Sequence, residues 1–270
     1  MQITWLGSLI YRLSSSNKST IMKNIDLVFK NSMTLKEQKH LCKAYFSHII
    51  MSITELLRAE FSNKRSYSKR LEVQGIDHLL NASIKGRGVF LLTAHLGNFE
   101  VIPGLFAGYN HDFAGQFHSV RKSLKNSFID KFLFGRFEKN NVKVIRDVNA
   151  IKGIKKALSE NGAVYFTVDQ GATCHAKSTC EIDFLGVKAN AYTTIASLAY
   201  HWKVPVVPII FYRVSHNKHI VELHPEIKWY EHPDKRIAII KNTQNYSKTI
   251  ESFILQHPEQ WIWSYNRWKR

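Results

Sequence analysis

The sequence predicts a single globular α/β domain, in which helices flank a central mixed, largely parallel sheet, together with an N-terminal helical segment. Short apolar runs alternate with amphipathic stretches along most of the chain, which is the pattern of strands and helices in such domains. Hydrophobic residues make up 44% and charged residues 22% of the 270 residues, ordinary values for a chain with one sizeable core. No repeat, low-complexity tract or linker interrupts the pattern. We place the N-terminal helical, membrane-associating segment at residues 1–60 and the α/β domain at residues 61–270.

Two helices are predicted in the N-terminal segment. The first is short and amphipathic, and either lies on lipid or caps the core; its apolar residues are Trp5, Leu6, Leu9, Ile10 and Leu13. The second covers Leu35–Leu57, where Thr34 and Glu37 have the spacing of an N-terminal capping box. We expect its apolar stripe to pack against the core; the stripe consists of Ile49, Ile50, Ile53 and Leu57.

Strands and helices alternate through the rest of the chain. Strands are expected at Gly88–Thr93, Asp112–Phe117, Val142–Ile145, Ala163–Val168, Val206–Tyr212 and Ile220–Leu223. Helices are expected to start near Asn98 and to cover Asn126–Glu138, Val148–Glu160 and Asn190–Trp202.

A formal net charge of +17 predicts an anionic partner. Nucleic acid, an anionic membrane surface and an acidic carrier protein all fit the charge. The sequence carries no zinc-finger spacing, RNP-like strand or helix-turn-helix pattern, which disfavours nucleic acid.

Cysteine usage indicates a reducing compartment, and hydropathy indicates no membrane span or signal peptide. Three cysteines are few for a disulfide framework, and an odd number cannot all be paired within one chain. Cys174, His175 and Cys180 match no structural zinc spacing, so we expect no metal site there. No apolar run reaches the roughly 18–20 residues of a membrane span, and the first residues lack the features of a signal peptide. We therefore expect cytosolic residence.

The passage LLTAHLGNFE contains the candidate catalytic residues. An apolar strand ends in His95, and Glu100 follows five positions later. On a regular helix five residues turn through about 500°, which leaves their side chains about 140° apart. The two converge if His95 lies on the turn and Glu100 on the first helical turns, with Gly97 allowing the tight passage and Asn98 capping. A histidine paired with a carboxylate takes a proton from a hydroxyl near neutral pH. The alternative is a capping histidine beside a solvated acid.

The passage AHLGNFE resembles the His-x4-Asp/Glu motif of glycerolipid acyltransferases, in the form found in lipid A secondary acyltransferases. Other stretches resemble that family in the same order along residues 21–270. They are Arg121 with Asn126, Phe128, Ile129 and Asp130, where Ser127 replaces a proline; Asp169-Gln170 after a strand; Phe184-Leu185-Gly186; Thr193-Thr194; and His257 to Trp263 with Arg267.

The resemblance implies transfer of an acyl group from a carrier-protein or coenzyme A thioester to a hydroxyl of a lipid A precursor. It makes His95 and Glu100 the catalytic pair, and Asn98, Arg121, Asp169, Gln170, Thr193 and Arg267 the substrate-binding residues. Arg146 and Arg213 are further candidates for phosphate recognition. Asp169 orients either Arg121 or the histidine, or caps a loop. No metal or other cofactor is implied, because the phosphopantetheine thioester supplies the driving energy.

The family places the enzyme at the cytoplasmic face of the inner membrane. Its members begin with a membrane-spanning helix before the Ile21–Ile25 region, whereas about 20 residues precede that region here, so we expect peripheral attachment. The tryptophans near the C-terminus either anchor at the interface or, for two of the three, pack against the sheet. Divergent relatives transfer glycine to lipid A, which confers resistance to cationic antimicrobial peptides and is the main alternative. A non-catalytic, basic lipid- or nucleic-acid-binding module is the third.

Overall fold

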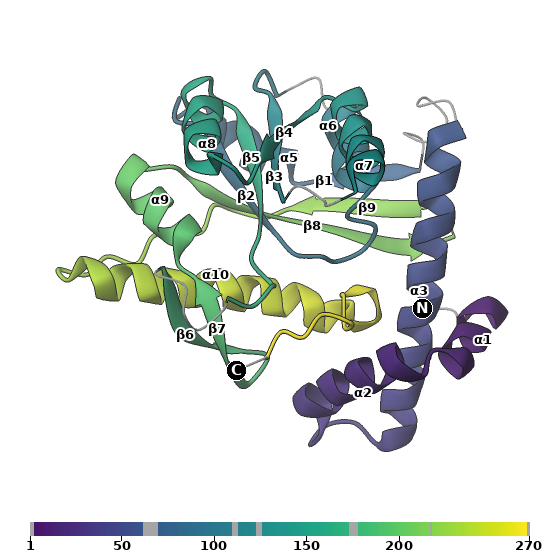
Figure 1. The fold of residues 1–270 in the computed structure, drawn as a ribbon. Helices are drawn as coiled ribbons and strands as arrows, with labels where there is room; N and C mark the ends of the chain where they lie inside the picture. The colour runs from purple at the N-terminus through teal and green to yellow at the C-terminus, as the bar shows by residue number, and fades with distance from the viewer. Residues whose placement is uncertain are drawn as a thin grey trace.

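A seven-stranded sheet forms the centre of the computed structural model (Figure 1), which describes residues 3–61, 70–109, 113–122, 126–172, 178–216 and 218–268. The strand order is β1-β9-β8-β2-β5-β3-β4. The bounds are β1 (Leu71–Gln74), β2 (Val89–Thr93), β3 (Phe117–Arg121), β4 (Val142–Arg146), β5 (Ala163–Thr167), β8 (Val206–Ser215) and β9 (Lys218–Leu223). From β8 to β4 neighbouring strands are parallel, whereas β9 is antiparallel to β8. The predicted mixed, largely parallel sheet is confirmed.

Helices cover both faces of the sheet. One face packs against α5 (Ile76–Ser83), α6 (Ile102–Tyr109) and α7 (Ser127–Lys139), and the other against α8 (Ala150–Ser159), α9 (Thr194–Trp202) and α10 (Lys235–Gln256). Along β2, Val89 and Leu91 pack on the face covered by α5, α6 and α7, and Phe90 and Leu92 pack on the opposite face. Because both faces are buried, this strand is apolar throughout. In Figure 1, α10 crosses the sheet on the side opposite to α6 and α7.

Three N-terminal helices, α1 (Trp5–Leu13), α2 (Ser15–Phe29) and α3 (Leu35–Phe61), form the helical segment. The predicted capping box of α3 is confirmed, because Glu37 Oε2 accepts from the Thr34 N–H at 2.7 Å and Thr34 Oγ1 from the Glu37 N–H at 3.3 Å. The Asn24 amide in α2 donates to the carbonyl oxygens of Trp263 and Tyr265 at 2.8 and 2.9 Å. These bonds tie the helical segment to the C-terminal segment. Among the residues described, no helix has the length and apolarity that crossing a bilayer requires.

A separate two-stranded sheet, β6 (Thr179–Phe184) and β7 (Val187–Tyr192), lies beside α10. Leu185 and Gly186 form its two-residue turn with φ of 51° and 76°, and positive φ at both positions matches the twist of a tight hairpin. The hairpin joins the part of the chain after β5 to α9.

Three predicted elements start at the wrong residue. The strand expected at Asp112–Phe117 begins only at Phe117 and runs to Arg121; Phe113 is buried in the core outside any strand, and Asp112 lies outside the described residues. The helix expected near Asn98 begins at Ile102. The helix expected from Asn190 begins at Thr194, because residues 190–192 pair in β7. In the predicted packing stripe of α3, Ile53 and Leu57 are instead exposed, at 48% and 53%.

Candidate active site

The candidate site lies at the carboxyl edge of the parallel strands. His95 follows the end of β2 by two residues, Asp169 follows the end of β5 by two, and Arg121 is the last residue of β3. Since β2 pairs with β5 and β5 with β3, all in parallel, the three strand ends meet at one edge. Parallel α/β sheets bind their ligands at this edge.

The turn after β2 is held by the C-terminal segment. Gly97 has φ of 62°, and a Cβ there would lie 2.1 Å from the carbonyl oxygen of Phe211, so the position requires glycine. Its N–H donates to the Gln260 carbonyl at 3.1 Å, and the Ile262 N–H donates to the His95 carbonyl at 3.2 Å. The tight turn predicted at Gly97 is confirmed. The two backbone hydrogen bonds to the C-terminal segment fix the direction in which the His95 side chain projects.

Asp169 holds the imidazole of His95. Asp169 Oδ1 lies 2.9 Å from His95 Nδ1, and Asp169 Oδ2 accepts from the His95 backbone N–H at 3.1 Å. Trp261 Nε1 donates to the same Oδ2 at 2.8 Å. The carboxylate is 1% exposed, so all of these bonds form away from water. On the other side of the ring, Gln170 Nε2 lies 3.4 Å from His95 Nε2.

The charges around His95 set its protonation. Burial acts to lower the pKa of His95, but the Asp169 carboxylate, its hydrogen bond and the Glu100 charge outweigh burial, so the pKa is raised. Burial acts to raise the pKa of Asp169, yet His95 and the donors around the carboxylate lower it. An ionised Asp169 only accepts hydrogen bonds, so His95 Nδ1 must carry a proton. In neutral His95 the lone pair is therefore on Nε2, on the side of Gln170.

Glu100 pairs with Arg121. The guanidinium donates to both carboxylate oxygens, from Nη2 to Oε1 at 2.8 Å and from Nη1 to Oε2 at 3.2 Å. It also lies over the Phe137 ring, 4.1 Å from the centroid. We expected Glu100 to hold the imidazole; the hydrogen bond to Nδ1 comes instead from Asp169, because the chain between His95 and Glu100 turns toward β3. Of the roles considered for Asp169, orientation of the histidine is the one that the geometry supports.

Asn98 and Arg213 belong to a buried polar cluster under α3. The Asn98 amide donates to Glu55 Oε2 at 2.8 Å, so the side chain anchors α3 rather than capping α6. Arg213 forms an ion pair with Glu55, and His219 Nε2 lies 3.1 Å from Glu55 Oε1. Arg213 is therefore buried and paired with Glu55, so it cannot be the phosphate ligand for which it was a candidate.

The remaining predicted substrate-binding residues make contacts away from His95. Arg267 is 2% exposed, donates to the Asn190 carbonyl at 2.7 Å and lies over the Phe184 ring, which makes it a structural residue. Arg146 pairs with Asp130 at 2.8 Å at the end of β4. Thr193 precedes α9 and lines a separate cavity with residues of β6 and α10, whereas its neighbour Thr194 lines a cavity beside the site. The side chains of residues 127–129, and residues 173–177 with Cys174 and His175, lie outside what the structure describes.

Three cavities adjoin the site. The charged cavity, about 330 Å³, contains His95, Glu100, Arg121 and Lys122 together with Phe99, Phe134 and Phe137. The α3 cavity, about 140 Å³, lies on the other side of His95 and is lined mainly by apolar atoms of α3, including Ile49, Ile53 and Leu56.

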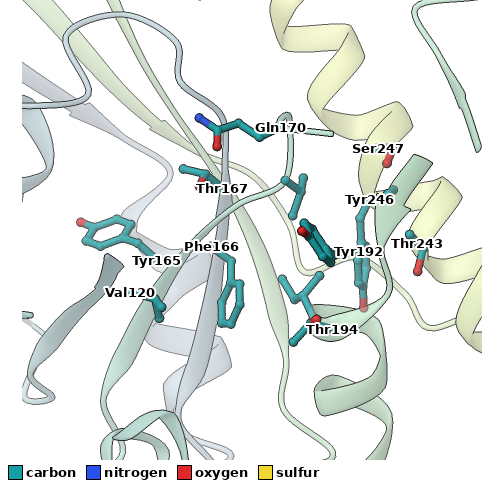
Figure 2. Close-up of a pocket in the computed structure, with 13 residues that line it drawn as sticks. Val120, Tyr165, Phe166, Thr167, Gln170, Tyr192, Thr194, Thr243, Tyr246 and Ser247 are labelled. Carbon is teal, nitrogen blue, oxygen red and sulfur yellow. The ribbon is translucent and has the colours of Figure 1, made fainter. Parts of the chain in front are cut away.

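The inner cavity, about 260 Å³, lies behind Gln170 (Figure 2). Its lining is Val120, Tyr165, Phe166, Thr167, Val168, Gln170, Ala191, Tyr192, Thr194, Ile195, Thr243, Tyr246 and Ser247. Val120, Tyr165, Thr167 and Gln170 also line the charged cavity, so the two cavities adjoin.

Comparison with known proteins decides the family. The model of the bacterial lipid A biosynthesis acyltransferase family matches residues 2–270. The chain belongs to this family. It is similar to the lipid A biosynthesis lauroyltransferase of Escherichia coli (strain K12), with 26% identity over 98% of this chain and 83% of that one. The palmitoleoyltransferase of the same strain is 23% identical over the same shares. A lipid A biosynthesis acyltransferase of Haemophilus influenzae is 19% identical over 96% of this chain and 77% of that one.

Membership of the family shows an acyltransferase of lipid A biosynthesis. The structure explains why the motifs occur together: the end of β2, the turn after it and the C-terminal Pro-Glu-Gln-Trp segment meet around His95. The bond from Trp261 to Asp169 was not predicted; the available signal was the tryptophan itself, because an indole N–H usually has a hydrogen-bond partner when it is buried. Within the described ranges, no cluster of histidine, cysteine and carboxylate side chains suited to a metal ion is found.

Proposed function

We propose that this protein transfers a fatty acyl group from a carrier-protein thioester to a hydroxyl of lipid A or its precursor, with His95 as the general base. The supporting observation is the buried His95–Asp169 pair at the edge of the sheet, where His95 lines both the charged cavity and the α3 cavity. A buried carboxylate on Nδ1 is the arrangement that lets a histidine accept a proton at Nε2.

The reaction needs one proton transfer in each direction. The acceptor oxygen attacks the thioester carbonyl carbon while its proton moves to His95 Nε2. The C–O bond forms, the C–S bond breaks, and the proton passes from Nε2 to the departing thiolate. Asp169 stabilises the imidazolium that exists between the two transfers. Glu100 and Arg121 position the substrate in the charged cavity, and Glu100 adds a second negative charge near the imidazolium.

A fatty acyl group fits the inner cavity better than a glycyl group does. A glycyl donor carries an ammonium group, which needs a carboxylate or several acceptor oxygens when it is taken out of water. Among the residues that the structure describes, the lining of the inner cavity contains no acidic side chain, and its exposed surface is mainly apolar. The glycyl alternative therefore requires the ammonium to remain in the charged cavity, where Glu100 is already paired with Arg121.

The proposed partners are an acidic acyl carrier protein, the anionic glycolipid and the membrane surface, with no role for nucleic acid and no cofactor beyond the donor's phosphopantetheine thioester. We propose peripheral attachment at the cytoplasmic face of the inner membrane through α1. Trp5 and Leu13 are 78% and 72% exposed on this helix, beside Arg12. Aromatic and aliphatic side chains next to cations are the composition of an interfacial helix. The formal charge of +17 adds attraction to anionic lipid.

The proposal is tested with purified protein, a lipid A precursor in detergent or vesicles, and an acyl-carrier-protein thioester, with the product identified by mass spectrometry. Wild type should add one fatty acyl group, and His95→Ala should lose transfer while keeping its thermal unfolding temperature. Folded His95→Ala with wild-type turnover would refute the base. Sedimentation with anionic vesicles, comparing wild type with Trp5→Ser/Leu13→Ser, tests attachment; undiminished binding of the variant would argue against α1 as the anchor.

A further inference from the structure

The inner cavity extends from Gln170 toward α9 and α10. Figure 2 shows Gln170 at one end of the cavity, with Tyr192, Thr194 and Tyr246 across it. Gln170 Nε2 lies 3.4 Å from the reacting nitrogen, His95 Nε2. A chain whose carbonyl carbon is beside His95 can therefore pass Gln170 into the inner cavity and extend toward α9 and α10.

The donor's acyl chain is the better occupant of this space than a chain of the acceptor. A carrier protein delivers its acyl chain through water, so the enzyme itself must shelter that chain during transfer. The acceptor is a membrane glycolipid, whose chains can remain in the bilayer. On the other side of His95, the α3 cavity is continuous with Ile53, which is 48% exposed, and so opens toward the surface. The inner cavity also reaches the surface, at Tyr192, which is 47% exposed, but its inner wall lies against the core, where Phe166, Ile195 and Tyr246 form it.

Tyr246 lines a second cavity in addition to the inner cavity. That second cavity, about 220 Å³, is lined by Tyr246 together with Arg87, Ala199, Tyr200, Lys203, Val204, Pro205, Val206, Glu226, Ile227, Trp229 and Glu231. Along α9, Ile195 lines the inner cavity and Ala199 the second. These residues are four positions apart and so lie one helical turn apart on the same face. Tyr246 is 2% exposed and lines both cavities.

We propose that Tyr246 is the specificity-determining residue that ends the donor pocket and so limits the length of the acyl chain that is transferred. This inference rests on the proposed acyl transfer. A chain that reaches the Tyr246 ring has no further room, and each additional methylene must displace the ring or leave part of the chain in water. Replacing the ring by a methyl group removes the wall and adds the second cavity, about 220 Å³, to the path of the chain.

The test measures kcat/KM for a series of straight-chain acyl-carrier-protein thioesters that differ in steps of two carbons. Tyr246→Ala should move the preference to longer chains, with a gain of roughly tenfold or more for the donor one step beyond the wild-type optimum relative to that optimum. Thr194→Leu, which fills the same cavity, should move the preference to shorter chains. Loss of folding cannot produce shifts of opposite sign. If Tyr246→Ala does not fold, Tyr246→Leu, which also removes the ring but keeps more of the buried volume, should shift the preference in the same direction.

Tyr200→Ala is the matched control, because it removes a tyrosine from the second cavity while the Tyr246 wall remains. Its preference should equal that of wild type. An unchanged preference in a folded Tyr246 variant would overturn the inference while leaving acyl transfer intact, whatever Thr194→Leu shows. Wild type that transfers no member of the series would overturn both the inference and the proposed function.

Discussion

Asp169→Asn is the substitution whose effect follows most directly from the site. Asp169 Oδ2 accepts two donors, the His95 backbone N–H at 3.1 Å and Trp261 Nε1 at 2.8 Å. In the variant, the single amide oxygen satisfies those donors only from the Oδ2 position. The NH₂ group must then face His95 Nδ1, 2.9 Å from it in the wild type.

An amide N–H facing Nδ1 reverses the tautomer of His95. Nδ1 becomes the acceptor, the ring proton moves to Nε2, and Nε2 can no longer take the proton of the acceptor hydroxyl. The equivalent reversal in a histidine–aspartate hydrolase reduces kcat by about 10⁴-fold. We expect kcat to fall by roughly 10³- to 10⁴-fold, or about 4 to 5.5 kcal/mol in the barrier.

The pH profile gives a second readout of the same change. In the wild type, the Asp169 charge helps to raise the pKa of His95, so activity should rise with pH through a value above the ordinary one for histidine. In Asp169→Asn that contribution is lost, and the acid limb of the residual activity should move to lower pH. The assay is acyl transfer to a lipid A precursor across the pH range, with Trp261→Phe as a milder control that removes one donor. Wild-type kcat in folded Asp169→Asn would refute the reasoning.

Three further predictions concern the surroundings of the pair. Glu100→Gln should shift the acid limb of kcat/KM to lower pH and Arg121→Met to higher pH, because Glu100 raises and Arg121 lowers the pKa of His95; pH–rate profiles that shift in the same direction would contradict this. Gly97→Ala forces a Cβ to within 2.1 Å of the Phe211 carbonyl at positive φ and should cost about 2–5 kcal/mol, which calorimetry would record as a melting temperature lower by roughly 5–15 °C. Glu55→Ala leaves Arg213 buried without its carboxylate and should destabilise by about 3–5 kcal/mol in chemical denaturation, whereas Glu72→Ala, which removes an exposed pair with Lys218, should change little.

The local pattern of the sequence predicted most of the sheet. Runs such as 88–93 and 163–168 are apolar because both faces of the sheet are covered, and the helices at 126–138 and 148–160 have regular apolar spacing. The boundaries that failed depend on long-range pairing. Residues 190–192 extend because they pair with residues 179–181 across the hairpin, and no pattern within residues 190–202 contains that information.

The sequence predicted that His95, Glu100, Arg121, Asp169 and Gln170 belong to one site, and the structure places them together, but the sequence predicted their contacts only in part. His95 is fixed by a short strand and a turn that the sequence shows directly. The carboxylate that orients it comes from 74 residues further along the chain, and Glu100, the nearer one in sequence, is drawn to Arg121 at the end of β3. Arg213 and Arg267 were predicted to bind substrate because arginine suits phosphate. Their burial against Glu55 and Phe184 follows from packing that single positions do not reveal.

The most direct test of the central claim is mass spectrometry of lipid A from cells with the wild-type gene, without it, and with His95→Ala in its place. Acyl transfer predicts a fatty-acyl mass increment that is present with the wild type and absent in both of the other strains. A glycine-sized increment, or a fatty-acyl increment that survives in the His95→Ala strain, would contradict the account.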